Sequence, residues 1–276
     1  MRTAIIIFFV LLCFCAHVFA QELRIAAPRK SLELGEELHY SVEWLGVPVG
    51  KIILKVEGQN LIRGYNCYHI TARAFPNSFL KKFYDIEYTV SSFMDVQGLF
   101  SVRFEKNRSL DGKKNYTVID FDPEANTANF ISEGQGGEQN LKIAPNRDKI
   151  ESVNLTTEKI PAATQDLLSS FYYFRLQDIQ EGSSLPINIY YNQRNWPVAM
   201  KVDKPFLREI RKKGAFCVVK VFPDSQINEY ILGKRRFEVF VTCDPSRIPL
   251  EFKLNTALGP LYARLSNLPR QWKDSN

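Results

Sequence analysis

Residues 38–44, LHYSVEW, place an apolar side chain at every second position, with polar side chains between them. A period of two is typical of a β-strand that buries one face. The segments that repeat this alternation are residues 52–56, 68–74, 86–90, 100–104, 187–191, 198–202, 237–241, 248–252 and 261–265. Glycine and proline separate many of these segments, as expected for turns. The pattern predicts a mainly β fold of antiparallel strands.

The two halves of the chain also share an order of residues. Cys67 precedes Asp95 by 28 positions, and Cys217 precedes Asp244 by 27 positions. Each cysteine follows a glycine by three positions. This shared order predicts an internal duplication. The two copies span approximately residues 34–122 and 181–266.

Residues 164–177, TQDLLSSFYYFRLQ, are the one segment with helical periodicity. Thr164 is expected to cap the helix, and Asp166 suits its positive N-terminal end. Leu167, Phe171 and Phe174 form an apolar stripe that we expect to be buried against the sheet. Ser169 and Ser170 are expected elsewhere on the helix, with Ser170 on the exposed face. The fold class expected is therefore a curved antiparallel sheet, either an open barrel or a sandwich, that two similar β units form and one central helix crosses.

The first 20 residues have the features of a cleavable signal peptide. Arg2 precedes an apolar run, and small residues precede the expected cleavage after Ala20. The run is too short for a membrane-spanning helix, which needs roughly 20 apolar residues. We therefore expect export to the periplasm, or otherwise out of the cytoplasm, and a mature chain of residues 21–276 that forms a single β-rich domain without integral membrane insertion.

Few side chains in the mature chain suggest a reactive centre. Its cysteines are Cys67, Cys217 and Cys243, an odd number that allows at most one internal disulfide, and Cys217 with Cys243 is the favoured pair. His39 and His69 are its only histidines, and no metal-ligand spacing or catalytic motif occurs. The sequence predicts no metal, no cofactor and no enzymatic activity. An exported chain without a reader motif is also a poor candidate for nucleic-acid binding.

The polar groups of the helix and of the segment after residue 243 are the candidate ligand contacts. They are Asp166, Ser169, Tyr172, Arg175, Asp244 and Arg247. The structural alternative is that Asp166 caps the helix and that Arg175 pairs with Asp244 or Asp95, since a charge near an apolar interface requires a partner.

Three stretches resemble a bacterial family known as domain of unknown function 3108. They are residues 35–50 (GEELHYSVEWLGVPVG), residues 165–175 (QDLLSSFYYFR) and residues 244–250 (DPSRIPL). The resemblance covers approximately residues 34–265. It implies an exported envelope protein of Gram-negative bacteria and no established activity.

These features leave three functions open. The favoured one is a non-catalytic envelope protein that holds an apolar or amphipathic ligand, such as a lipid or glycolipid, in a β cavity. The second is a scaffold or assembly factor that binds envelope proteins. The third is a hydrolase of envelope polymers, which would require Asp95, Asp244, His39 or His69 to gather around a cleft.

Overall fold

The computed structural model describes residues 24–27, 29–83, 85–110, 112–134, 154–210, 214–224 and 236–267. The expected signal peptide, residues 1–20, lies outside them. The strands are β1 (Glu37–Trp44), β2 (Val47–Ile62), β3 (Tyr65–Pro76), β4 (Ile86–Asp95), β5 (Ser101–Leu110), β6 (Lys113–Asp122), β7 (Thr127–Gly134), β8 (Asn154–Lys159), β9 (Ser184–Tyr190), β10 (Asn195–Val202), β11 (Phe206–Ile210), β12 (Gly214–Pro223), β13 (Phe237–Thr242), β14 (Pro249–Thr256) and β15 (Gly259–Leu265). The helices are the 3-10 turn η1 (Leu80–Lys82) and the α-helix α2 (Leu167–Leu176).

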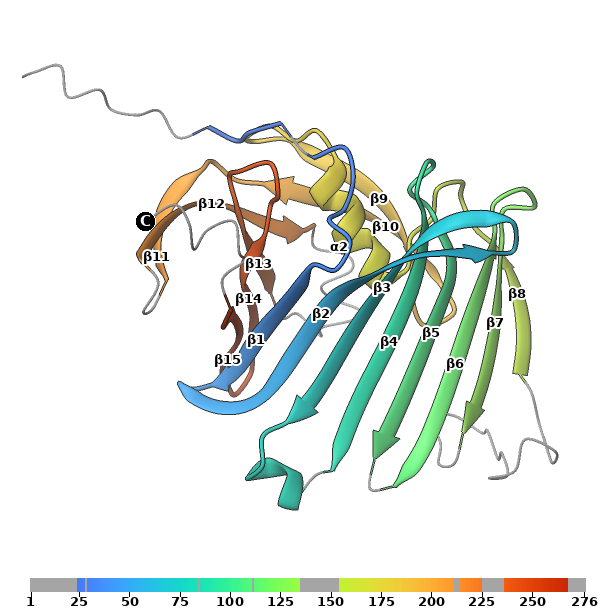
Figure 1. Ribbon diagram of the computed structural model, residues 1–276, viewed down its shortest axis with the longest axis horizontal. Coiled ribbons are helices and arrows are strands. Elements are labelled where there is room, and N and C mark those ends of the chain that lie inside the picture. The colour runs from blue at the N-terminus through green and yellow to red at the C-terminus, as the bar shows by residue number, and fades with distance from the viewer. Residues whose placement is uncertain are drawn as a thin grey trace, which may run out of the picture.

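All fifteen strands belong to one antiparallel sheet (Figure 1). Its order is β8-β7-β6-β5-β4-β3-β2-β1-β15-β14-β13-β12-β10-β9, and β11 pairs with β12. The first and last strands of the folded domain, β1 and β15, are therefore neighbours in the middle of the sheet. The predicted mainly β fold, one curved sheet with one α-helix, is confirmed, and the sheet is an open barrel rather than a sandwich.

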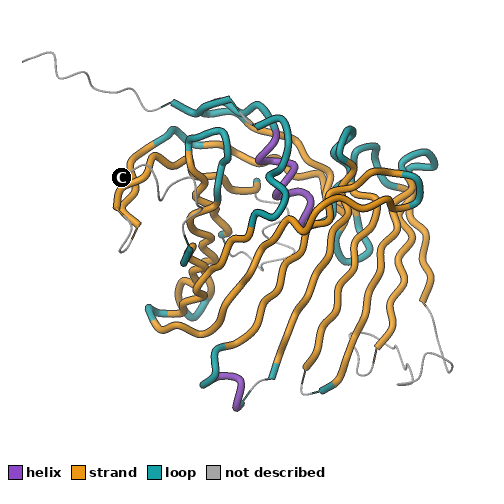
Figure 2. Tube along the Cα trace, in the orientation of Figure 1, coloured by secondary structure: helices purple, strands orange, loops and turns teal. Residues whose placement is uncertain are grey.

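The sheet curves until its two edges approach each other. Thr156 on β8 donates a hydrogen bond to the side chain of Gln193, just after β9, at 3.2 Å. Phe121 and Tyr190 also pack with their ring centroids 5.9 Å apart. Helix α2 contacts β3 and β4 from one half of the sheet and β9 from the other. Figure 2 shows this helix among the strands, so it bridges the two arms of the curved sheet.

Each half of the sheet contains an antiparallel pairing whose register shifts by one residue. β3 pairs with β2 along its whole length, and the register shifts once, between Val56 and Gly58. In the second half β12 pairs with two strands in succession, first β11 and then β10, and its register also shifts by one between them. The internal duplication stays a prediction, which superposition of the two halves would test.

Cys67 and Cys217 each lie on a strand of these pairings, but they face different residues. Cys67 on β3 faces Asp95 on β4. In the second half Cys217 faces Cys243 rather than Asp244, and the two form a disulfide with 5.5 Å between their Cα atoms. The bridge closes a loop of 26 residues, for which the chain-entropy argument gives about 3.5 kcal/mol of stabilisation. Cys67 is a buried free thiol, and burial raises its pKa to about 12.

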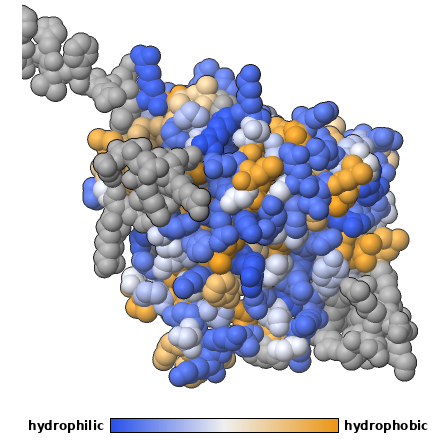
Figure 3. Space-filling view, viewed as in Figure 1, coloured by the Kyte–Doolittle hydropathy of each residue, from blue (hydrophilic) through white to orange (hydrophobic). Residues whose placement is uncertain are grey.

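One face of the molecule is mostly polar. Figure 3 shows a largely hydrophilic face on which hydrophobic side chains lie in separate spots. Within the described ranges, no helix has both the length and the apolar character needed to cross a membrane.

Candidate functional site

Helix α2 is anchored at its start by a buried capping box. The carboxylate of Asp166 accepts hydrogen bonds from the backbone N–H groups of Leu168 and Ser169, at 2.7 and 2.9 Å. In return the Ser169 hydroxyl accepts from the backbone N–H of Asp166 at 3.0 Å. Asp166 is therefore the N-cap, and the expectation that Thr164 caps the helix was wrong. The Thr164 hydroxyl instead donates to the carbonyl of Pro161.

The same carboxylate ties the helix to the first half of the sheet. Ser92 on β4 and Ser101 on β5 donate their hydroxyls to Asp166 Oδ2, at 2.6 and 2.8 Å. All three residues are buried, and burial raises the pKa of Asp166 even though these hydrogen bonds act to lower it. A buried polar group of this kind stabilises a structure only when its hydrogen bonds are made, so the cluster fixes the helix start.

The other end of the helix is held by a buried ion pair. Arg175 donates two hydrogen bonds to the carboxylate of Glu36, at 2.6 and 2.7 Å, and also donates to the carbonyl of Ser246. Burial would lower the pKa of Arg175, but the Glu36 carboxylate raises it above its usual value. The prediction that Arg175 pairs with Asp244 or Asp95 was wrong. Those two carboxylates instead accept backbone hydrogen bonds within their own turns.

Three separate stretches of sequence therefore meet at this helix. Glu36 lies in the first stretch that carries the family resemblance, Arg175 in the second and Ser246 in the third. The ion pair accounts for an arginine at 175 and a carboxylate at 36 by structure alone, because a bidentate arginine requires a carboxylate at one fixed position. Ser246 contributes its backbone carbonyl. The polar side chains of the helix therefore act as structural anchors.

Two other candidate contacts are also buried away from any cavity. Arg247 is fully buried and donates to the carbonyl oxygens of Gln177 and Ala26. Burial lowers its pKa to about 10. Tyr172 packs in a cluster with Tyr68 and other core side chains, under the guanidinium of Arg175. None of the six residues named from the sequence as ligand contacts lines the cavity described next.

A large apolar cavity, here called the chamber, lies beside the face of α2 opposite its polar anchors. Its volume is about 460 Å³. Residues from α2, β1, β2, β9, β10, β12, β13, β14 and β15 line it, and all but Ser170 are apolar. They are Val42, Ile52, Leu54, Leu167, Leu168, Ser170, Phe171, Phe174, Ile187, Ile189, Val198, Met200, Val221, Pro223, Phe237, Val239, Val241, Phe252, Leu254, Leu261 and Ala263.

The chamber corrects the predicted orientation of the helix. Leu167, Phe171 and Phe174 all line it, but only Phe174 is fully buried; Phe171 is half-buried and Leu167 is 39% exposed. Ser169 and Ser170 are buried, so the expectation that Ser170 is exposed was wrong. The polar anchors therefore hold one face of the helix while its apolar face is left as a wall of the chamber.

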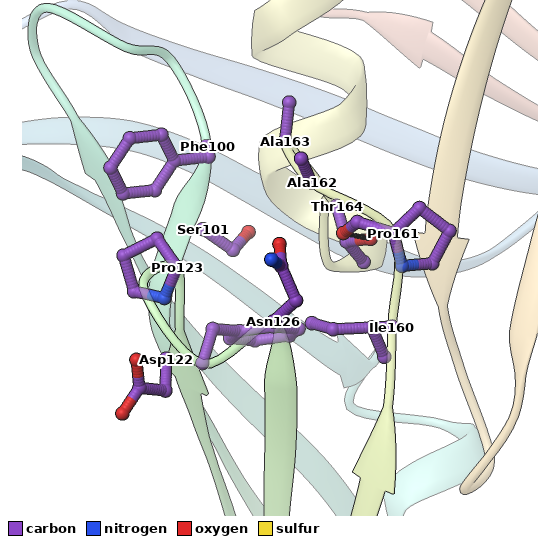
Figure 4. Close-up of a pocket in the computed structure, with 11 residues that line it drawn as sticks. Phe100, Ser101, Asp122, Pro123, Asn126, Ile160, Pro161, Ala162, Ala163 and Thr164 are labelled. Atoms are coloured by element: carbon purple, nitrogen blue, oxygen red, sulfur yellow. Dashed lines mark hydrogen bonds between the residues drawn. The ribbon is translucent and has the colours of Figure 1, made fainter.

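A second cavity lies near the start of α2 but is far smaller. Figure 4 shows it between the side chains of Asn126, Ser101 and Thr164, with Ile160 and Pro161 nearby. Its volume is about 10 Å³, which is room for about one water molecule. The Oδ1 atom of Asn126 is buried there without a protein partner. A space of this size is suited to solvent, so the chamber is the candidate ligand site.

The groups that a hydrolase would need are not assembled at the chamber. His39 lies on β1, where its ring contacts Glu37, and His69 stacks on Phe93 with 4.6 Å between ring centroids. Neither residue, nor Asp95 or Asp244, lines the chamber. In the part of the chain that the structure describes, no three His, Cys, Asp or Glu side chains are grouped as a metal site would require.

An open, barrel-like sheet around an apolar chamber defines the structural class of this protein. The chain belongs to the family described as protein of unknown function (DUF3108), whose sequence pattern matches residues 39–266. It is similar in fold to the crystal structure of a β-barrel-like protein of domain of unknown function DUF1849 from Brucella abortus. That match has a TM-score of 0.54 at 10% identity and covers 87% of this chain and 98% of the other. No curated protein matches the sequence.

Proposed function

We propose that this protein is a non-catalytic carrier of the cell envelope that binds an apolar or amphipathic ligand, such as the acyl chain of a lipid or glycolipid, in the chamber. The observation that carries the proposal is a cavity of about 460 Å³ with a single polar residue among its lining. Several lining side chains, among them Val42, Phe237 and Phe252, are only partly buried. An apolar occupant would remove their remaining surface from water.

The size of the chamber suits one acyl chain. Small-molecule sites occupy roughly 300–1,000 Å³. Burial of each methylene group is favourable by about 0.8 kcal/mol, so a chain of twelve such groups gains about 10 kcal/mol before its ordering and association costs. A gain of this size supports binding without any directed hydrogen bond, in agreement with the nearly unbroken apolar lining.

An amphipathic ligand fits better than a wholly apolar one. We place the opening of the chamber beside the start of α2, where Leu167 lines the chamber and is 39% exposed. A polar headgroup at an opening of this kind can stay hydrated, and only the chain needs to enter. This arrangement avoids the cost of burying an unpaired polar group.

We include export in the same proposal. A disulfide between Cys217 and Cys243 is typical of an oxidising compartment such as the periplasm. The N-terminal sequence has the pattern of a signal peptide. N-terminal sequencing of the protein from a periplasmic extract should begin at Gln21, whereas retention of Met1 would contradict export with cleavage.

The proposed function is tested by identifying the molecules that co-purify with the protein. Protein purified from the periplasm without detergent should carry a bound lipid or glycolipid, detected by native mass spectrometry and identified after solvent extraction. The purified protein should also bind palmitate in buffer, with one molecule bound per chain. A protein that emerges without ligand and does not bind palmitate saturably would overturn the proposal.

A further inference from the structure

Six large apolar side chains are exposed together at one end of the sheet. Five of them are more than 60% exposed, and the sixth, a tryptophan, is 39% exposed. We call this set the tip patch: Trp44, Leu45, Val47, Phe79, Phe83 and Leu258. Contiguous exposed apolar groups are uncommon on a monomeric protein and mark an interaction site.

Two hairpin tips form the centre of the tip patch. The β1–β2 tip lies beside the β14–β15 tip because β1 pairs with β15, and Trp44 faces Leu261 there. The indole N–H of Trp44 donates to the carbonyl of Leu258 at 3.2 Å. Leu45 packs so closely on this neighbour that a Cβ atom at Gly259 would lie 2.5 Å from its Cδ2. The two tips are therefore one surface.

The connection between β3 and β4 extends this surface. Asn77, just after β3, donates backbone and side-chain hydrogen bonds to the carbonyls of Val49 and Pro48 in the β1–β2 hairpin. The following turn, η1, is flanked by Phe79 and Phe83, whose ring centroids are 5.5 Å apart. Figure 1 shows η1 and the β1–β2 hairpin projecting at the same end of the sheet.

Basic side chains accompany the apolar ones. Lys81 and Lys82 are exposed within η1, and Lys81 lies 3.5 Å from Asp85. Arg236 is exposed and accepts a backbone hydrogen bond from Asn255, two residues before the β14–β15 tip. Exposed tryptophan, phenylalanine and leucine beside lysine and arginine are typical of a surface that rests in the headgroup region of a membrane.

The tip patch also borders the chamber. Leu261, which faces Trp44 in the sheet, lines the chamber, and so does its partner Leu254. Both are only partly buried. A lipid surface in contact with the tip patch would therefore lie next to the apolar lining, without crossing the polar outer face.

We propose that the tip patch docks this protein peripherally on an anionic lipid bilayer. The hairpin tips insert their apolar side chains among the headgroups, and Lys81, Lys82 and Arg236 contact lipid phosphates. The docking surface stands on its own observations, and its use for loading the chamber rests on the proposed function. None of the six residues of the tip patch lines the chamber, so docking and ligand binding can be altered separately.

The test uses mature protein and vesicles of phosphatidylcholine and phosphatidylglycerol in a 3:1 ratio. Wild type should cosediment with these vesicles, and more weakly with pure phosphatidylcholine. Leu45→Glu with Leu258→Glu should lower the bound fraction at least tenfold. The matched control is Leu34→Glu with Leu61→Glu, which changes two exposed leucines outside the tip patch and adds the same charge. The control should stay within twofold of wild type.

Palmitate binding in vesicle-free buffer separates this proposal from the proposed function. It should be unchanged in both double variants, and both should retain the wild-type circular dichroism and melting curve. Vesicle binding without palmitate binding would remove the carrier function and leave the docking surface. Failure of wild type to bind vesicles, or equal loss in the two variants, would overturn docking and point instead to a protein partner at the tip patch.

Discussion

Replacement of Arg175 by methionine is expected to lower the free energy of unfolding by about 3–5 kcal/mol. The guanidinium and the Glu36 carboxylate are both nearly inaccessible, with side-chain exposures of 5% and 6%. Loss of the arginine leaves a buried carboxylate without its charged partner, which is the most costly way to break such a pair. Urea unfolding followed by circular dichroism measures the change.

Two companion variants show whether this cost arises from the unpaired charge. Glu36→Gln with Arg175→Met removes both charges and should recover part of the lost stability, because neither remaining group is ionised. Arg73→Met breaks the Arg73–Glu87 pair, whose side chains are about half exposed, and should cost less than about 1 kcal/mol. If Arg175→Met were no more harmful than Arg73→Met, Arg175 would not be an anchor of α2.

Replacement of Ala263 by phenylalanine is expected to weaken palmitate binding about 30-fold. Ala263 lies on β15 between Val42 and Phe252, and all three line the chamber, so the added ring enters the cavity. A phenyl group that displaces about three methylene groups removes about 2 kcal/mol of burial, which corresponds to roughly this factor. Displacement of a fluorescent fatty acid gives the affinity.

Ala199→Phe is the matched control for the chamber. Ala199 lies on β10 between Val198 and Met200, which both line the chamber, so its own side chain points to the other face of the strand. The same substitution there should change palmitate affinity by less than about twofold. Equal affinities of the two variants would show that palmitate does not occupy the chamber. Unfolding midpoints of both variants would reveal any loss of the fold.

The class of fold could be predicted from the sequence because strand periodicity is local. The alternation in residues 38–44 corresponds to β1, whose Leu38 and Tyr40 are buried. Alternation through the two halves predicted the sheet, and the helical periodicity of residues 164–177 predicted its one α-helix. The choice between barrel and sandwich could not be made, since it depends on how far the sheet curves and on which strands meet at its centre.

The contacts of the helix were harder to predict because its partners are distant in sequence. Glu36 lies 139 residues from Arg175, whereas Asp244 and Asp95 were candidates by charge alone. Ser169 and Ser170 suggested a polar outer face, yet both are buried, Ser169 by the capping box and the Ser101 hydroxyl. Serine is small enough to be buried once its hydroxyl has a partner. Its polarity therefore led to the wrong prediction of which face of the helix is exposed.

A β cavity was the favoured interpretation, but its position and lining could not be recognised from sequence for a related reason. Val198, Val239 and Leu254 have the same alternation as core residues such as Val102 and Ile119. Whether inward side chains meet across the sheet or leave a cavity depends on its curvature and on the position of α2. One signal was present: the stripe of Leu167, Phe171 and Phe174 was recognised, although it was assigned to packing rather than to a ligand wall.

Paramagnetic broadening by a spin-labelled fatty acid tests whether an acyl chain occupies the chamber. Stearate with a nitroxide near its methyl end would be titrated into protein with labelled Ile, Leu and Val methyl groups. We expect saturable broadening of Val198, Val239 and Leu254, which line the chamber, while Val102 and Ile119 stay sharp. Broadening confined to exposed leucines such as Leu155 and Leu207, or no saturable broadening, would contradict a ligand chamber.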